Sequence, residues 1–181
     1  SDGTVWAWGA DHYSGAGPAI SHASPVQVLE LSGVTAIAAG DDFSRVLRSD
    51  GTVWGWGDNF DGQLGDGTTT SRSTPVQAVG LGAVTALGPS RSPGLALRSD
   101  GTVWAWGRNN EGQLGDGTRT TRLLPGPVST LSDVAALAGG DDHSLALHLD
   151  GTVSAWGNNG RGQLGDGFAR YRLSPARVPL P

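Results

Sequence analysis

The chain carries the stretch Asp50-Gly51-Thr52-Val53-Trp54-Gly55-Trp56-Gly57, and close copies of it recur along the sequence. The string Asp-Gly-Thr-Val begins, at intervals of 48, 50 and 50 residues, at Asp2, Asp50, Asp100 and Asp150. The last copy has Ser154 where the others have their first Trp. Gly-Gln-Leu-Gly-Asp-Gly follows three of the copies, at 62–67, 112–117 and 162–167. A fixed period of about 50 residues indicates a repeat architecture.

The local signals within each unit favour β-strands. Thr52–Trp56 is β-branched and aromatic, as strands prefer. The Asp-Gly pair before it is typical of a tight hairpin turn, because Gly adopts positive φ without steric cost. We therefore expect four strands per unit, which in the second unit are Val34–Ala39 (A), Ser44–Ser49 (B), Thr52–Trp56 (C) and Val76–Val79 (D). The first unit supplies only strands C and D, at Thr4–Trp8 and Val26–Leu29.

Four short antiparallel strands in each repeat predict an all-β fold, the β-propeller. The chain should form about three and a half four-stranded blades, with fourteen strands. We divide it into one half-blade and three blades that together make one propeller arc, at residues 1–33, 34–83, 84–133 and 134–181.

The tryptophans explain how such blades would pack. Two Trp residues that lie two apart on strand C point to the same side of the sheet. Large aromatic rings on that side would fill the space between neighbouring blades. We therefore expect an inter-blade structural role for Trp6, Trp8, Trp54, Trp56, Trp104, Trp106 and Trp156.

Composition excludes several functions. The 181 residues include no Cys, so thiolate nucleophiles and thiolate zinc sites are impossible. All twelve basic residues are Arg, and there is no Lys. A net charge of −5 argues against a nucleic-acid partner, and no apolar run is long enough for a membrane span. Paired carboxylates such as Asp41-Asp42 match no calcium loop and are typical of turns. We expect no cofactor, no metal and no catalytic residue: the protein is not an enzyme.

At this point the sequence resembles the regulator-of-chromosome-condensation repeat family, through Gly140–Leu147, Asn109–Gly115 and the Trp-Ala-Trp-Gly strand. The resemblance covers essentially the whole chain and implies half of a seven-bladed ring. Eukaryotic members of this family exchange guanine nucleotide on a small GTPase and bind nucleosomes. A secreted bacterial member inhibits β-lactamase through loops on one rim, and the regularity of this chain is similar to that bacterial type. One departure is the segment Gly88–Gly94, which we interpret as a two-residue insertion.

The loops indicate where a partner would bind. An up-and-down blade places its A–B and C–D loops on one rim and its B–C and D–A turns on the other. The B–C turns are nearly identical between units, whereas the A–B and C–D loops differ, as functional loops on a rigid scaffold do. We predict partner contacts at His12, Tyr13, Phe43, Phe60, Asp61, Arg91, Arg108, Glu111, His143 and Arg161.

These observations favour a non-enzymatic scaffold that binds an unidentified protein through one rim, outside the cell or at its surface. Two alternatives remain open. The chain could be a structural module that closes a ring as a homodimer, or docks onto the remainder of a longer propeller, because an open arc exposes two apolar flanks. It could also be an exchange factor or a chromatin-binding propeller, which its acidity does not favour.

Overall fold

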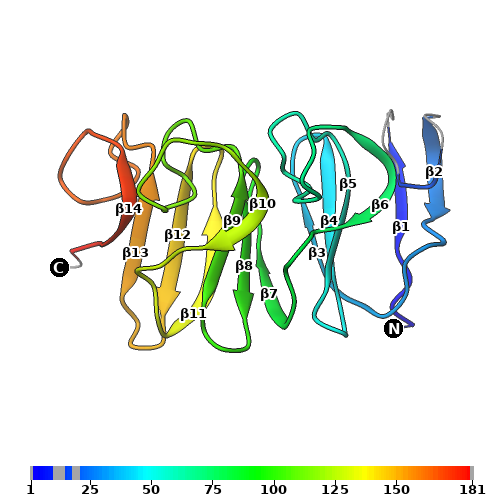
Figure 1. Ribbon diagram of the computed structural model, residues 1–181, viewed down its shortest axis with the longest axis horizontal. Coiled ribbons are helices and arrows are strands. Elements are labelled where there is room, and N and C mark those ends of the chain that lie inside the picture. Colours follow the sequence, from blue (N-terminus) through cyan, green and yellow to red (C-terminus); the bar gives the residue numbers. More distant parts are fainter. Residues whose placement is uncertain (1, 10–14, 18–20, 180–181) are drawn as a thin grey trace.

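A computed structural model describes residues 2–9, 15–17 and 21–179, and every regular element in them is a β-strand. The fourteen strands form one two-stranded and three four-stranded antiparallel sheets, arranged side by side as an arc (Figure 1). Within each four-stranded sheet the order along the sheet follows the sequence, A-B-C-D. The fold is a partial β-propeller of three and a half blades, as predicted.

The strands fall into four equivalent sets. The A strands are β3 (Val34–Ala39), β7 (Val84–Gly88) and β11 (Val134–Gly139). The B strands are β4 (Phe43–Arg48), β8 (Gly94–Arg98) and β12 (His143–His148). The C strands are β1 (Trp6–Gly9), β5 (Val53–Gly57), β9 (Val103–Gly107) and β13 (Val153–Gly157). The D strands are β2 (His22–Gln27), β6 (Arg72–Gln77), β10 (Arg122–Pro127) and β14 (Arg172–Arg177).

Strands A, B and C lie within a residue or two of their predicted positions, but strand D does not. The second-unit D strand, β6, begins at Arg72, four residues before the predicted start at Val76. It includes Pro75, which lies just outside the predicted strand. Proline is tolerated there because strand D is an edge of its sheet, where one side of the backbone needs no ladder partner.

The predicted insertion at Gly88–Gly94 is also wrong. In β7 and β8, Gly88 pairs with Leu95, and in the preceding blade Ala38 pairs with Arg45 in the same way. The same number of residues therefore separates these paired positions in both blades, and Gly88 corresponds to Ala38 instead of Gly40.

The second Trp of each complete blade forms the core between blades. Trp106 and Trp156 are fully buried, and each packs on apolar residues of the preceding blade. Gly65 and Gly115 make room for these two rings, since a Cβ at either glycine would lie within 3 Å of the indole nitrogen. The first Trp, as at Trp54 and Trp104, is only half-buried.

The two ends of the arc lack a neighbouring blade. Trp6 and Trp8 of β1 are 52% and 64% exposed, so they do not fill an inter-blade space within this chain. Ile37 on β3 is 75% exposed, whereas Leu137, its equivalent on β11, is 7% exposed. At the other end Leu147 is 42% exposed, and its equivalent Leu47 is 4% exposed. The arc therefore presents an uncovered apolar flank at each end.

Candidate protein-binding rim

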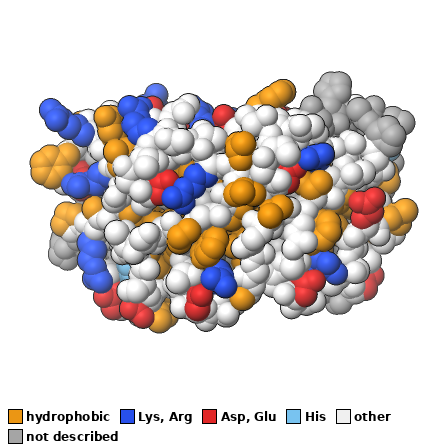
Figure 2. All heavy atoms as spheres, in the orientation of Figure 1, with side chains coloured by type: hydrophobic (Ala, Val, Ile, Leu, Met, Phe, Trp, Pro, Cys, Tyr) orange, Lys and Arg blue, Asp and Glu red, His pale blue; other side chains and the backbone are white. Residues whose placement is uncertain are grey.

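The A–B and C–D loops gather along one edge of the arc, the upper edge in Figure 1. The A–B loops span residues 40–42, 89–93 and 140–142, and the C–D loops span 58–71, 108–121 and 158–171. The opposite edge carries the tight B–C turns, where acidic and basic side chains lie close together (Figure 2). We call the loop edge the variable rim and the other the turn rim.

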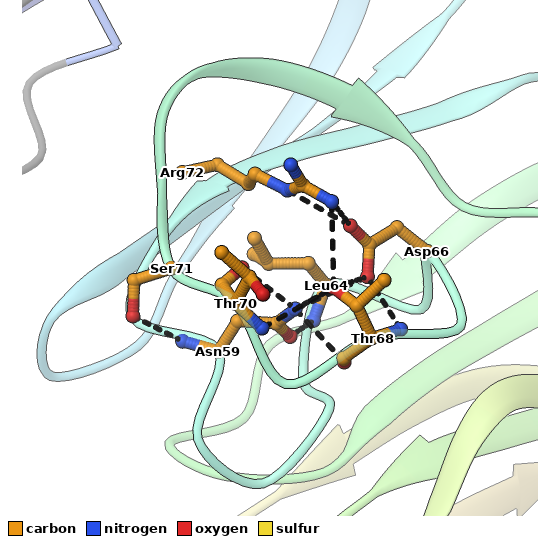
Figure 3. A network of polar contacts seen from close by, with 7 residues as sticks. All are labelled: Asn59, Leu64, Asp66, Thr68, Thr70, Ser71 and Arg72. Carbon is orange, nitrogen blue, oxygen red and sulfur yellow. Dashed lines mark hydrogen bonds and ion pairs between the residues drawn. The ribbon is translucent and has the colours of Figure 1, made fainter.

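In each of these three C–D loops one buried asparagine bonds the loop backbone from inside. The Nδ2 atom of Asn59 donates to the carbonyl oxygens of Thr68 and Thr70 at 3.0 and 3.1 Å, and to Oδ1 of Asp66 at 3.1 Å (Figure 3). Its Oδ1 accepts the backbone N–H of Leu64 at 2.9 Å. Asn109 and Asn159 are buried at the equivalent positions and make matching bonds. The loop backbones are therefore fixed while their tips vary.

The Asp of the Gly-Gln-Leu-Gly-Asp-Gly motif completes this network. Asp66 accepts hydrogen bonds from the Thr68 backbone and hydroxyl, and its other oxygen pairs with Arg72 at 2.6 Å. Although partial burial disfavours its charge, these donors hold the pKa of Asp66 below its ordinary value. The motif thus forms a structural turn whose carboxylate is already satisfied.

Arg91 joins the A–B loops of three blades at the variable rim. It lies on the middle A–B loop, and its Nε bonds the Asp41 carboxylate of the loop before it. Its Nη1 bonds Oδ2 of Asp141, on the loop after it, at 3.0 Å. The guanidinium is about half exposed, so these ion pairs contribute little to stability. They do link the three loops to one another in the structure.

A second arginine, Arg45, supports the same loop from below. It occupies a B-strand position that is Leu95 in the next blade, and it is buried. Its guanidinium donates to the carbonyl oxygens of Ser92 and Pro93, and it lies 4.4 Å from the centre of the Phe43 ring. Burial lowers the pKa of Arg45 to about 9, so the side chain stays charged at neutral pH.

The loops enclose an acidic hollow of about 350 Å³ at the variable rim. Six carboxylates and two guanidinium groups line it: Asp41, Asp42, Asp58, Asp61, Asp141, Asp142, Arg91 and Arg108. Arg108 lies 3.6 Å from Asp142 across the boundary between two blades. With both arginines already engaged by aspartates, the hollow presents excess negative charge to solvent.

The structure brings several of the predicted contact residues together here. Asp61, Arg91 and Arg108 line the acidic hollow, and Phe60 projects from the neighbouring loop tip with 76% of its surface exposed. Phe43 also borders the hollow, but its ring is buried and packs on Gly40.

Three further predicted contact residues do not line that hollow. His143 is half-buried and packs on Gly140 in the way that Phe43 packs on Gly40. Glu111 pairs with Arg119 at 3.5 Å, and Arg161 is exposed on the last C–D loop. His12 and Tyr13 lie outside the described residues.

Sequence reasoning missed the residues that hold the rim in place. Asn59, Asn109 and Asn159 recur at one position of the repeat, a signal for a structural role that was available from the sequence. The sequence also shows Arg45 as a charged residue at a repeat position that is Leu95 and Leu145 in the other blades.

The described residues include no group of three or more His, Asp or Glu side chains able to hold a metal ion. Nor do they include a helix long and apolar enough to cross a bilayer.

The fold and this rim define a partial propeller in which repeated blades carry variable loops, and buried asparagines hold the backbone of these loops. Two models of the regulator of chromosome condensation (RCC1) repeat match the sequence, one at residues 50–87 and 100–147 and the other at 34–63 and 134–163. The chain belongs to the RCC1 repeat family. No match was found among curated proteins.

Solved structures give the same result for the fold. Human WBSCR16 superposes with a TM-score of 0.84 at 26% identity, over 99% of this chain and 49% of that one. Yeast RCC1 (Prp20), in a complex with Kap60, gives a TM-score of 0.53 at 22% identity, over 99% of this chain and 58% of that one. A second structure of Prp20p from Saccharomyces cerevisiae, whose study concerned binding to Gsp1p and histones, gives 0.54 at 21% identity over 99% and 59%. The chain spans about half the length of these proteins.

Proposed function

We propose that the protein is a non-enzymatic scaffold that binds a protein partner through its variable rim. The observation that carries this proposal is the acidic hollow, which loops of all three complete blades build together. Complementary charge steers association and selects partners, so we expect the partner to present Arg or Lys side chains to this rim. Phe60, exposed next to Asp61 of the hollow, offers an aromatic side chain of a type that is enriched in protein interfaces.

The experiment compares matched variants in affinity capture. Wild-type chain, a variable-rim variant with Asp41→Asn and Asp141→Asn, and a turn-rim variant with Asp50→Asn and Asp100→Asn are used to capture proteins from the native source. A partner retained by the wild type and the turn-rim variant but lost by the variable-rim variant supports the proposal. A partner lost only on the turn-rim change would overturn it. Fractionation of the same source tests the proposed location outside the cell or at its surface.

The two apolar flanks favour a second candidate, self-association or docking onto further blades. Trp8 and Ile37 at one end and Leu147 at the other are exposed at positions that neighbouring blades cover elsewhere in the arc. Covering such surfaces is favourable in proportion to the apolar area removed from water. The acidic rim gives no comparable support to binding of DNA. Measurement of mass in solution separates this candidate from rim binding by a monomer.

A further inference from the structure

A hollow on the turn rim of the last blade lies where the other blades carry a tryptophan ring. In the second blade the indole N–H of Trp54 donates to Oγ1 of Thr52 at 3.1 Å, and Arg48 lies 5.9 Å from the ring centre. In the third blade Trp104 and Arg98 repeat this arrangement, with a guanidinium-to-ring distance of 5.3 Å. Each of these arginines also pairs with the aspartate of the adjacent turn.

The last blade has lost both members of that pair. Ser154 stands at the Trp position and His148 at the Arg position. What remains is a hollow of about 510 Å³, lined among others by Thr130, Pro175 and Arg177 as well as Ser154 and His148. The loss of one large ring therefore left space that nothing in the described chain fills.

The polar groups around the hollow are organised. His148 Nδ1 lies 2.9 Å from the carbonyl oxygen of Ser132, so this nitrogen carries the proton. Nε2 then accepts from the Ser154 hydroxyl, 2.9 Å away, and both side chains are buried. In the third blade Arg98 donates to the carbonyl oxygen of Gly82, the equivalent of Ser132. His148 therefore makes the same hydrogen bond in the last blade, although it carries no guanidinium.

A different residue restores the lost cation. Arg177, on β14 directly beside Ser154, bonds Oδ2 of Asp150 at 3.1 Å, the bond that Arg98 makes to Asp100 in the third blade. Oγ1 of Thr152 donates to Asp150 but accepts no hydrogen bond among the described residues, whereas Thr52 and Thr102 each accept one from an indole. Arg177 thus lines the hollow, and the Thr152 hydroxyl, two residues before Ser154, stands where Thr52 and Thr102 accept from a Trp ring.

From this arrangement we propose that the hollow binds a flat aromatic ring of indole size that carries an N–H group. The ring takes the place of the missing Trp side chain, with its N–H directed to Thr152 and its face beneath Arg177. A guanidinium over an aromatic face is attractive, most strongly for indole. This site lies on the turn rim and does not rest on the proposed function of the variable rim.

The test is a titration of the labelled 181-residue chain with indole, followed by two-dimensional NMR. We expect saturable shifts at Leu149, Asp150 and Ser154, with a dissociation constant on the order of 1 mM or tighter. 1-Methylindole, which lacks the N–H donor, should bind about fivefold more weakly. N-acetyltryptophanamide serves as a second probe: tighter binding than indole indicates a Trp side chain of a partner as the source, and weaker binding a free ring.

Two variants make the test specific. Ser154→Trp restores the residue that the other blades carry and should abolish the shifts, while Trp104→Ser, which leaves Arg98 and Thr102 in place, should create a second indole site in the third blade. Binding that survives Ser154→Trp, or shifts confined to the exposed flanks, would overturn the proposal. If Ser154→Trp does not fold, the test rests on 1-methylindole and on the third-blade variant. Equal affinities for indole and 1-methylindole, together with no indole binding in the third blade of that variant, would refute the proposal.

Discussion

The indole nitrogen of Trp106 donates a 2.9 Å hydrogen bond to the backbone carbonyl oxygen of Gln63, in the C–D loop of the preceding blade. Trp156 makes the same bond to Gln113 at 2.8 Å. One side chain thus fills the space between two blades and also anchors the base of the variable rim. Blade packing and loop position are therefore coupled in this protein.

Truncation of this anchor should be costly. Trp106→Ala removes a fully buried ring and should lower the free energy of unfolding by about 3 to 5 kcal/mol. Trp104→Ala, at a half-buried position of the same strand, should cost clearly less, and Trp8→Ala least of all. Denaturant unfolding of the three variants measures the loss of unfolding free energy at each site. Equal losses at all three sites would contradict the assignment of Trp8 to an uncovered flank.

The exposed flanks predict that the chain does not remain a monomer. Light scattering should show a dimer or larger species at micromolar concentration, because association covers Trp8, Ile37 and Leu147. Trp8→Arg and Leu147→Arg should each shift the population toward monomer. Phe60→Ser, a change at an equally exposed aromatic residue on the rim, should not. A wild-type chain that is monomeric throughout would show that the flanks need no cover.

The turn carboxylates predict acid sensitivity. The hydroxyl and backbone N–H of Thr152 donate to Asp150, and together with Arg177 they lower the pKa of Asp150 to about 2. The unfolded carboxyl binds its proton near its ordinary value of 3.8, so the stabilisation is present above about pH 4 and is lost as pH falls toward 2. Thermal unfolding midpoints between pH 5 and pH 2 should fall less steeply for Asp150→Asn than for the wild type. An identical slope would exclude this contribution.

Arg45 should control the order of one rim loop more than global stability. Arg45→Leu introduces the residue found at positions 95 and 145, and the loss of a buried charge offsets the lost hydrogen bonds. We expect unfolding free energies within about 2 kcal/mol of the wild type. Amide hydrogen exchange at Arg91 and Ser92 should rise several-fold, because their loop loses its support. Arg48→Leu at the turn rim is the control, and an equal effect of both changes would contradict this role.

The repeat made most of the fold predictable. The β-branched and aromatic residues and the Asp-Gly turn predicted strands A, B and C, because these signals act locally within each hairpin. Strand D was predicted at Val76–Val79, after Pro75, whereas β6 includes this proline, because it lies at an edge position that only the assembled sheet reveals. The supposed insertion at Gly88 arose because a glycine was matched to Gly40, whereas backbone pairing matches it to Ala38.

The rim was predictable only in outline. Strand topology and the divergence of the loops predicted which loops form the variable rim. The contacts between loops of different blades were not predictable, because they depend on how the blades pack. Phe43, a predicted contact residue, is buried against Gly40, and the buried Arg45 supports the loop that presents Arg91. The sequence shows that Ser154 replaces a Trp of the other repeats. That the resulting hollow carries a guanidinium became clear only from the structure, which places Arg177 beside Ser154 on the neighbouring strand.

The central claim, that the variable rim is the binding surface, is tested most directly by hydrogen exchange of the chain with and without a captured partner. Protection should appear at the A–B loops, residues 40–42, 89–93 and 140–142, and at the tip around Phe60. The B–C turns at Asp50 and Asp100 should exchange at the same rate in both states. Protection of those turns, or of the flanks alone, with an unchanged rim would contradict the claim.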